Sequence, residues 1–190
     1  DKIKENWKSI EVAITKTVQL LIDFGFDALT LTSRNSVIPI IYYVYKGGSI
    51  KKNKERNQLK KYLQLSLLTG LFGSHGDSVL ENIRKSLTKV DSNGFKVLKS
   101  KLFNFSDLKK SINMPGKSLE INDEVINRIM LYKKGRQAFI TLSILYPNLR
   151  YNEIEFDQDH IHPSFSFSDI KLKDINLNSS DMIRWQEMKD

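Results

Sequence analysis

Apolar residues recur at steps of three and four along most of the first 147 residues, a spacing that is typical of amphipathic helices. The first predicted helix ends near Gly25, and its apolar residues are Ile3, Trp7, Ile10, Ile14, Val18 and Leu21. Further helices are predicted over residues 36–46, about 54–72 and 137–146. Two more helices are predicted to begin at Asp77 and at Asn122. The sequence therefore predicts a mainly α fold, a helical bundle, over residues 1–147.

Polar residues and glycines mark where these helices begin and end. Ser36, Asp77 and Asn122 each precede an apolar run, so they are predicted to cap helix N-termini. Residues 133–135, Lys-Lys-Gly, are typical of a helix C-terminus, which favours cations and glycine. Residues 91–118 carry weaker patterns and are predicted to be irregular, with one or two short helices.

Composition narrows the class of protein. The 190 residues include no cysteine, which excludes disulfides, thiolate metal sites and cysteine nucleophiles, and favours a cytoplasmic location. Hydrophobic residues make up 40% of the chain, which excludes a mainly disordered protein. No apolar run reaches the ~18 residues of a membrane span, and the N-terminus lacks the apolar part of a signal peptide. Because the sequence begins without Met, we expect a piece of a longer protein.

Charge divides the chain into two parts. Residues 1–150 carry 26 basic and 13 acidic side chains, whereas residues 151–190 carry 4 basic and 9 acidic ones. The sign changes near Pro147, which predicts a basic helical domain over residues 1–147 and a separate module over residues 148–190. A basic body of this kind attracts polyanions, and DNA is the partner we expect. The alternative is a lysine-rich surface that only keeps the protein in solution.

Basic residues gather in two segments. The first segment, residues 46–61, can follow a phosphate backbone, or can be a solvated loop and helix start. The second segment, residues 96–110, combines lysines with Phe103 and Phe105, which could stack on bases but are more typical of a core. The candidate DNA-binding residues lie in the first segment and are Lys51, Lys52, Lys54, Arg56, Lys60 and Lys61.

A third pattern, FDQDHIHP at residues 156–163, contains two of the three histidines. A carboxylate beside an imidazole suits metal-assisted hydrolysis, because the carboxylate holds a hard cation and the imidazole accepts a proton from water. In an extended strand His160 and His162 share one side, and Asp157 and Asp159 the other. A polar turn and a metal site without nuclease activity are alternatives.

The same segment resembles the first strand of an HNH, or ββα-metal, nuclease in its Asp-His-Ile-x-Pro form. SRNSVIPIIYYVYKGG and LLTGLFGSHGDSVLENIR resemble the helical part of the GmrSD-like proteins. These modification-dependent restriction factors join an N-terminal ParB-like domain to helices and a C-terminal HNH domain. The resemblance covers roughly residues 1–165 and implies that a short C-terminal β-hairpin begins an HNH module within residues 148–190.

By this resemblance, Asp159 would bind Mg²⁺ or another divalent cation, and His160 would be the catalytic general base. His162 stands at a variable position and would contact a phosphate or a neighbouring carboxylate. The family pattern also requires an Asn in an Asn-Leu-x-x-Leu setting, and neither Asn176 nor Asn178 stands in one. We therefore expect the sequence to stop inside its nuclease module, with the ParB-like domain belonging to the same parent chain.

Two functional hypotheses follow. The first is a fragment of a restriction-type, metal-dependent DNA endonuclease that acts against foreign DNA, with the fragment itself catalytically incomplete. The second is a non-catalytic helical module that binds DNA or a partner protein. His75, in the turn GSHGD, could contact a phosphate, but capping of the next helix by Asp77 or Ser78 is the favoured interpretation of this turn.

Overall fold

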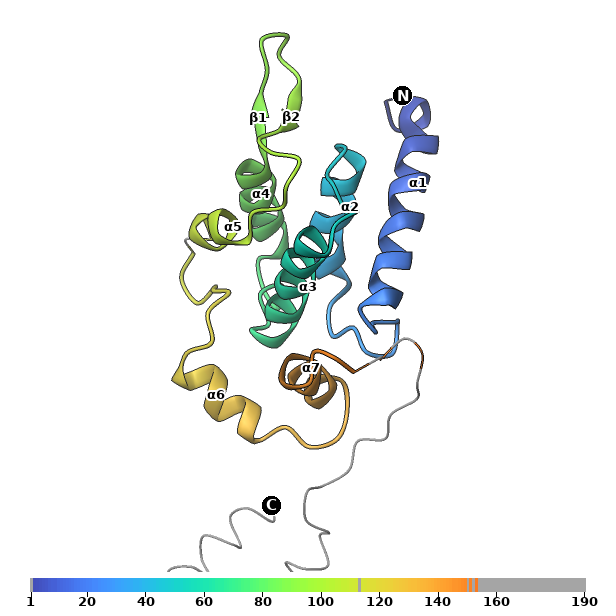
Figure 1. The fold of residues 1–190 in the computed structure, drawn as a ribbon. Helices are drawn as coiled ribbons and strands as arrows, with labels where there is room; N and C mark the ends of the chain where they lie inside the picture. Colours follow the sequence, from blue (N-terminus) through green and yellow to red (C-terminus); the bar gives the residue numbers. More distant parts are fainter. Residues whose placement is uncertain (1, 113, 150, 152, 154–190) are drawn as a thin grey trace, which may run out of the picture. The chain divides into compact units, whose positions relative to one another are not determined.

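A computed structural model describes residues 2–112, 114–149, 151 and 153, which all lie within one unit of the chain, residues 1–156 (Figure 1). The helices are α1 (Lys2–Asp23), α2 (Ile38–Tyr45), α3 (Asn53–Leu68), α4 (Gly76–Leu87), α5 (Phe105–Ser111), α6 (Asp123–Met130) and α7 (Arg136–Leu145). A 3-10 turn, η1 (Arg34–Val37), leads into α2, and strands β1 (Thr88–Val90) and β2 (Lys96–Leu98) form an antiparallel hairpin. The predicted mainly helical fold is confirmed. The C-terminal β-hairpin expected within residues 148–190 falls outside the described residues.

Helix α3 lies in the core and packs against α5, α7 and η1 (Figure 1). Every residue from Tyr62 to Leu68 is buried, so the second half of this helix has no solvent-exposed side. Burial forces its polar groups to find partners. Gln64 meets this requirement because its Nε2 donates to Oγ and to the carbonyl oxygen of Ser143 in α7, at 3.0 and 3.1 Å. This contact joins α3 to the helix packed against it.

The apolar stripe predicted on α1 lies mostly on the surface. Ile3 and Trp7 are 63% and 56% exposed, and Ile14 and Val18 are exposed as well. The buried side of α1 is instead a neighbouring face, formed by Ala13, Thr17 and Leu20, and the helix contacts α2. Thr17 is tolerated there because its Oγ1 donates to the carbonyl oxygen of Ala13 at 2.8 Å. Apolar periodicity alone therefore located the helix but not the side that packs.

The predicted helix starts are correct at Asn122 and wrong at Ser36 and Asp77. The Asn122 side chain accepts a hydrogen bond from the backbone N–H of Val125, as an N-cap does. Ser36 lies inside η1 and makes no cap bond, because the 3-10 turn runs directly into α2. Asp77 is already in the first turn of α4, where a carboxylate favours the positive end of the helix dipole. The residue before that turn is His75, in the left-handed region at φ 51°.

Residues 133–135 and 91–118 also differ from their predicted roles. Helix α6 ends at Met130, so Lys133 and Lys134 lie beyond it, and Gly135 with φ 133° precedes α7 instead. Within 91–118 the short helix α5 was expected, but β2 was not. The strand forms because Val97 pairs with Lys89 across a turn that contains Gly94 at φ 79°. Three-residue strands are too short to show a convincing period of two in the sequence.

One buried hydroxyl gives a testable consequence of this packing. Tyr62 is fully buried, and its hydroxyl has no hydrogen-bond partner among the described residues. Replacing a buried, unpaired polar group by an apolar one of the same shape removes a desolvation penalty. We expect Tyr62→Phe to leave the free energy of unfolding unchanged or to raise it by about 1 kcal/mol, as measured by urea denaturation. Tyr43→Phe is the matched control and should lower it, because the Tyr43 hydroxyl is hydrogen-bonded.

Candidate nucleic-acid interface

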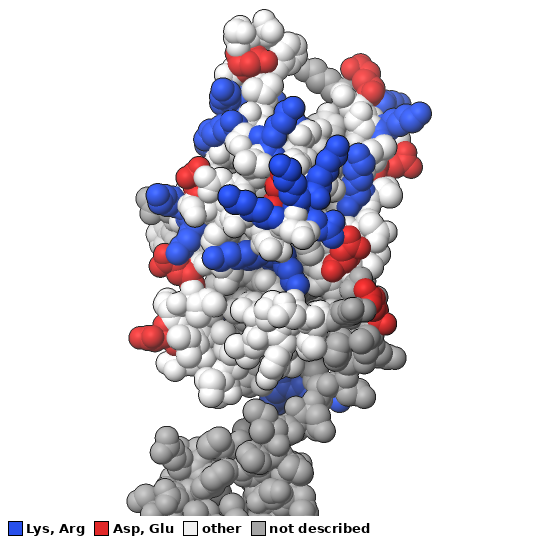
Figure 2. Space-filling model, in the orientation of Figure 1, with Lys and Arg blue, Asp and Glu red and all other residues white. Residues whose placement is uncertain are grey.

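Lysine and arginine side chains gather on one face of the described unit, over α3, α5 and the base of the hairpin (Figure 2). Lys51 and Lys52 lie just before α3, and Lys54 and Lys61 follow two turns apart on that helix. Lys99 and Lys101 follow β2. We call the exposed members of this group the basic face, which consists of Lys51, Lys52, Lys54, Lys61, Lys99 and Lys101.

Tyr43 joins the two basic segments that the sequence showed as separate. Its hydroxyl lies 3.1 Å from the carbonyl oxygen of Ser49 and 2.5 Å from that of Lys101. The backbone N–H of Ser49 also donates to the carbonyl oxygen of Lys101 at 2.9 Å. The ring packs edge-on against Phe103, with centroids 5.3 Å apart. The chain after β2 is thereby fixed beside the segment that enters α3.

Glu55 holds the backbone of the lysines that begin the basic face. Although it is an acidic residue among lysines, it is only 6% exposed. Its Oε2 accepts hydrogen bonds from the backbone N–H groups of Lys51 (3.1 Å) and Lys52 (2.9 Å), and from the Ser49 hydroxyl. The hydrogen bond from Ser49, followed by that from the backbone of Lys52, lowers the pKa of Glu55 below its ordinary value of 4.5. The Glu55 carboxylate therefore points into the fold, whereas the side chains of the neighbouring lysines are exposed to solvent.

The lowered pKa of Glu55 predicts how stability depends on pH. A carboxyl whose pKa is lower in the folded state stabilises the fold when it is ionised, above its ordinary pKa. The stabilisation by ionised Glu55 is lost as the pH falls below 4.5 and then through the lower pKa that Glu55 has in the folded state. We expect Glu55→Gln to lower the urea midpoint at pH 7, and the difference from wild type to shrink below pH 4.5. Glu124→Gln, at an exposed carboxyl of α6, is the control and should change the urea midpoint at pH 7 less than Glu55→Gln does.

Arg56, Lys60 and Lys61 have contacts within the fold. Arg56 forms an ion pair with Asp23 at the end of α1, at 2.6 Å, and lies over the ring of Phe24. This ion pair lowers the pKa of Asp23. Lys60 is half-buried, and burial lowers its pKa. Lys61 is exposed, with its Nζ 5.1 Å from the centre of the Phe105 ring. Arg56 and Lys60 are thus less available to a ligand than the exposed lysines.

The aromatic residues of the second basic segment belong to the core, which was the favoured interpretation. Phe103 and Phe105 are 3% and 5% exposed. Phe103 packs against both Tyr43 and Tyr62. The exposed aromatic residue near these lysines is Phe95, at 68%, which the sequence analysis did not single out. Its position in a Gly-containing turn between two lysine-bearing strands was the signal that could have found it.

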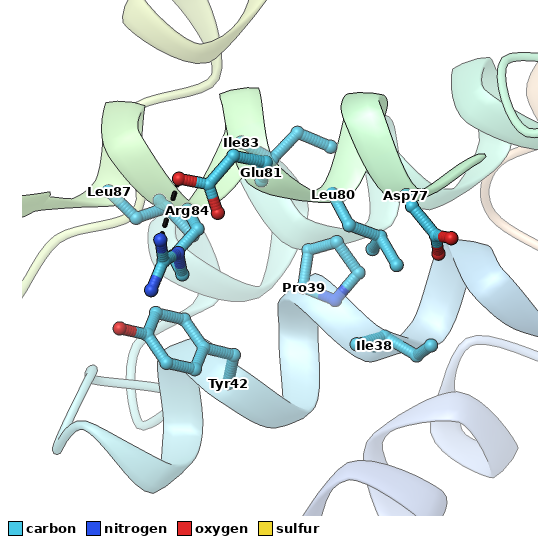
Figure 3. A pocket seen from close by; sticks show the side chains of 9 residues that line it. All are labelled: Ile38, Pro39, Tyr42, Asp77, Leu80, Glu81, Ile83, Arg84 and Leu87. Atoms are coloured by element: carbon cyan, nitrogen blue, oxygen red, sulfur yellow. Dashed lines mark hydrogen bonds and ion pairs between the residues drawn. The ribbon is translucent and has the colours of Figure 1, made fainter. Parts of the chain in front are cut away.

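A small apolar pocket lies between α2 and α4 (Figure 3). Pro39 and Ile38 of α2 face Leu80 of α4, and the cavity measures about 210 Å³. Most small-molecule sites are larger, at roughly 300–1,000 Å³. At the rim Arg84 pairs with Glu81 at 2.6 Å, so the two charges satisfy each other. The pocket lining includes neither a nucleophile with a base nor a set of metal ligands, and it does not resemble a catalytic site.

The predicted catalytic and metal residues, Asp159, His160 and His162, lie outside the described residues. Within residues 2–112, 114–149, 151 and 153, no group of three or more His, Asp or Glu side chains could hold a metal ion. His75 is exposed and belongs to no such group within the described residues. Within the described unit we take the basic face as the candidate site.

Among the described helices, none is both long and apolar enough to cross a membrane. No protein-family model matches the sequence, and no curated protein is significantly similar to it.

Proposed function

We propose that the described unit binds DNA through its basic face. The observation that carries this proposal is the junction at Tyr43, Ser49 and Lys101, which brings two lysine-rich segments onto one exposed surface. The acidic residue within the first segment, Glu55, is turned inwards, and its carboxylate accepts hydrogen bonds from the backbone of Lys51 and Lys52. Exposed lysines gathered on one face suit the regularly spaced phosphates of a nucleic acid.

Binding of this kind depends on salt and not on base sequence. Each lysine that neutralises a phosphate releases a condensed counterion, so log K falls linearly with log salt concentration. Six lysines that each made one contact would give a slope of about −5 on duplex DNA. Phosphate contacts position a protein on DNA but do not read its sequence.

The test is a fluorescence-anisotropy titration of a labelled duplex of about 20 base pairs, repeated across a range of salt concentrations. We expect binding that weakens steeply with salt and changes little when the base sequence is shuffled. Absence of binding at low salt, or affinity that ignores salt, would rule out the proposal. An uncharged polysaccharide serves as a control and should not compete.

A second candidate, the restriction-type endonuclease, is favoured by the segment Asp159-His160-Ile161-His162-Pro163. Here the DNA-binding unit would belong to a GmrSD-like parent chain with a ParB-like domain, in the cytoplasm. Asp159 would bind Mg²⁺ or another divalent cation, His160 would accept a proton from water, and His162 would lie near a phosphate. The bound cation would neutralise charge that develops on the phosphate.

The nuclease proposal has its own experiment. DNA is incubated with the parent protein in Mg²⁺, and the rate of strand cleavage is compared between wild type and His160→Ala. We expect the substitution to reduce cleavage by about 10²-fold or more while duplex affinity stays unchanged. Equal cleavage rates would remove His160 from the mechanism, and would leave DNA binding by the basic face unaffected.

A further inference from the structure

The β1–β2 hairpin is a narrow ribbon that extends beyond the helices of the described unit (Figure 1). Thr88 pairs with Leu98, Lys89 with Val97 and Val90 with Lys96. Its base is fixed on α4, because the Thr88 hydroxyl donates to the carbonyl oxygen of Arg84 at 2.8 Å and the Lys99 N–H to that of Leu87 at 2.9 Å. The ribbon therefore has a defined origin on the core.

The tip of the hairpin is ordered by its own hydrogen bonds. Oδ1 of Asp91 accepts from the backbone N–H groups of Asn93 (2.9 Å) and Phe95 (2.8 Å). The Asp91 N–H donates to the carbonyl oxygen of Phe95 at 2.9 Å. Gly94, at φ 79°, provides the left-handed residue that a short hairpin loop of this kind requires. The carboxylate of Asp91 is thus engaged by the turn, and the turn presents its side chains in a fixed arrangement.

This ordered tip exposes apolar side chains between lysines. Phe95 is 68% exposed and Val90 is 63% exposed. Phenylalanine and valine are among the residues that are most often buried in folded proteins. Lys89 and Lys96 flank them on the two strands and are also exposed. The chain then leads from β2 through Lys99 to Lys101, so the ribbon is continuous with the basic face.

We propose that this hairpin enters the major groove of a DNA duplex whose backbone lies on the basic face, with Phe95 in contact with base edges. The inference rests on the proposed DNA binding. The major groove of B-form DNA admits a two-stranded ribbon, and apolar side chains contact the thymine methyl group there. Lys89 and Lys96 contact the phosphates on either side. Double-stranded RNA is a poorer ligand for the ribbon, because its major groove is too deep and narrow.

The test compares wild type with Phe95→Thr, which retains strand propensity and changes no charge. We expect duplex DNA affinity to fall at least about fivefold while the salt slope stays the same. Lys89→Gln with Lys96→Gln should instead reduce the steepness of the slope by about 1.8. Leu29→Ala, which removes another exposed apolar side chain, should bind like wild type. Melting temperatures should match wild type, since all these side chains are exposed.

Methylation of guanine N7 by dimethyl sulfate reports on the groove, because N7 lies in the major groove. Wild type at saturation should reduce N7 methylation along the duplex, Phe95→Thr should not, and affinity for duplex RNA should be equal for the two proteins. If wild type binds DNA and Phe95→Thr binds equally well, the hairpin proposal is wrong and the basic-face proposal stands. If wild type fails to bind DNA, both are wrong. If Phe95→Thr alters only self-association, the hairpin is a protein contact and the inference is overturned.

Discussion

Replacing Tyr43 by alanine is expected to lower the free energy of unfolding by about 3–5 kcal/mol, the usual cost of removing a buried aromatic ring. Tyr43 is fully buried, and its ring packs against Phe103. The ring also lies so close to Gly48 that a Cβ at that glycine would come within 2.3 Å of the tyrosine Cζ. Gly48 has no side chain with which to fill the space that the ring leaves, so we expect little relaxation there.

The lost hydroxyl adds to the effect and links stability to the basic face. Without it, the carbonyl oxygens of Ser49 and Lys101 lose a shared donor. Burial raises the pKa of Tyr43 to about 12, so the hydroxyl keeps its proton at neutral pH. Because the unfolded chain loses this proton near pH 10, the stabilisation declines as pH rises through that value and towards 12.

Urea denaturation of the variants measures these contributions. Tyr43→Phe should cost about 1–2 kcal/mol, which is the share of the hydroxyl. Tyr45→Ala, two residues along the same helix at a half-buried position, is the control and should cost clearly less than Tyr43→Ala. Equal losses for Tyr43→Ala and Tyr45→Ala would show that Tyr43 does not join the two basic segments in the way described.

Replacing Lys51, Lys52 and Lys54 together by glutamine is expected to weaken duplex DNA binding by about two to three orders of magnitude at ~0.1 M salt. The estimate assumes one phosphate contact for each lysine and about 0.9 released counterions for each contact. The slope of log K against log salt should become less steep by about 2.7. Because the three side chains are exposed, the fold should be retained.

The matched control changes the same charge elsewhere. Lys117, Lys133 and Lys134 lie in the segments on either side of α6 and are outside the basic face. Their replacement by glutamine gives the same net charge as the first variant. If both triple variants lost affinity equally, total charge and not the basic face would control binding. A much smaller loss in the control is the expected result.

The helices could be predicted from the sequence because their signals are local. The Asn122 cap depends on an amide three residues away, and the burial of α3 follows from its largely apolar second half. The packed side of α1 could not be predicted, because both Trp7 and Leu20 are apolar and only the position of α2 decides between them. The hairpin was missed because its strands are three residues long.

The candidate site shows the same division between local and distant signals. The lysines themselves are visible in the sequence, but their union depends on Tyr43 and Lys101, which are 58 residues apart. Nothing in the local pattern around Tyr43 distinguishes it from the neighbouring tyrosines of an apolar helix. The inward turn of Glu55 depends on Ser49 and the backbone before α3. The roles of Asp159, His160 and His162 stay predictions from the sequence.

The most direct test of the central claim compares the two halves of the basic face on one duplex. One variant carries Lys51→Gln, Lys52→Gln and Lys54→Gln, a second carries Lys99→Gln and Lys101→Gln, and a third carries all five. If one surface binds the DNA backbone, each half should reduce the steepness of the salt slope, and the combined variant should show about the sum of the two changes. A salt slope that stays at the wild-type value when Lys99 and Lys101 are replaced would contradict the claim.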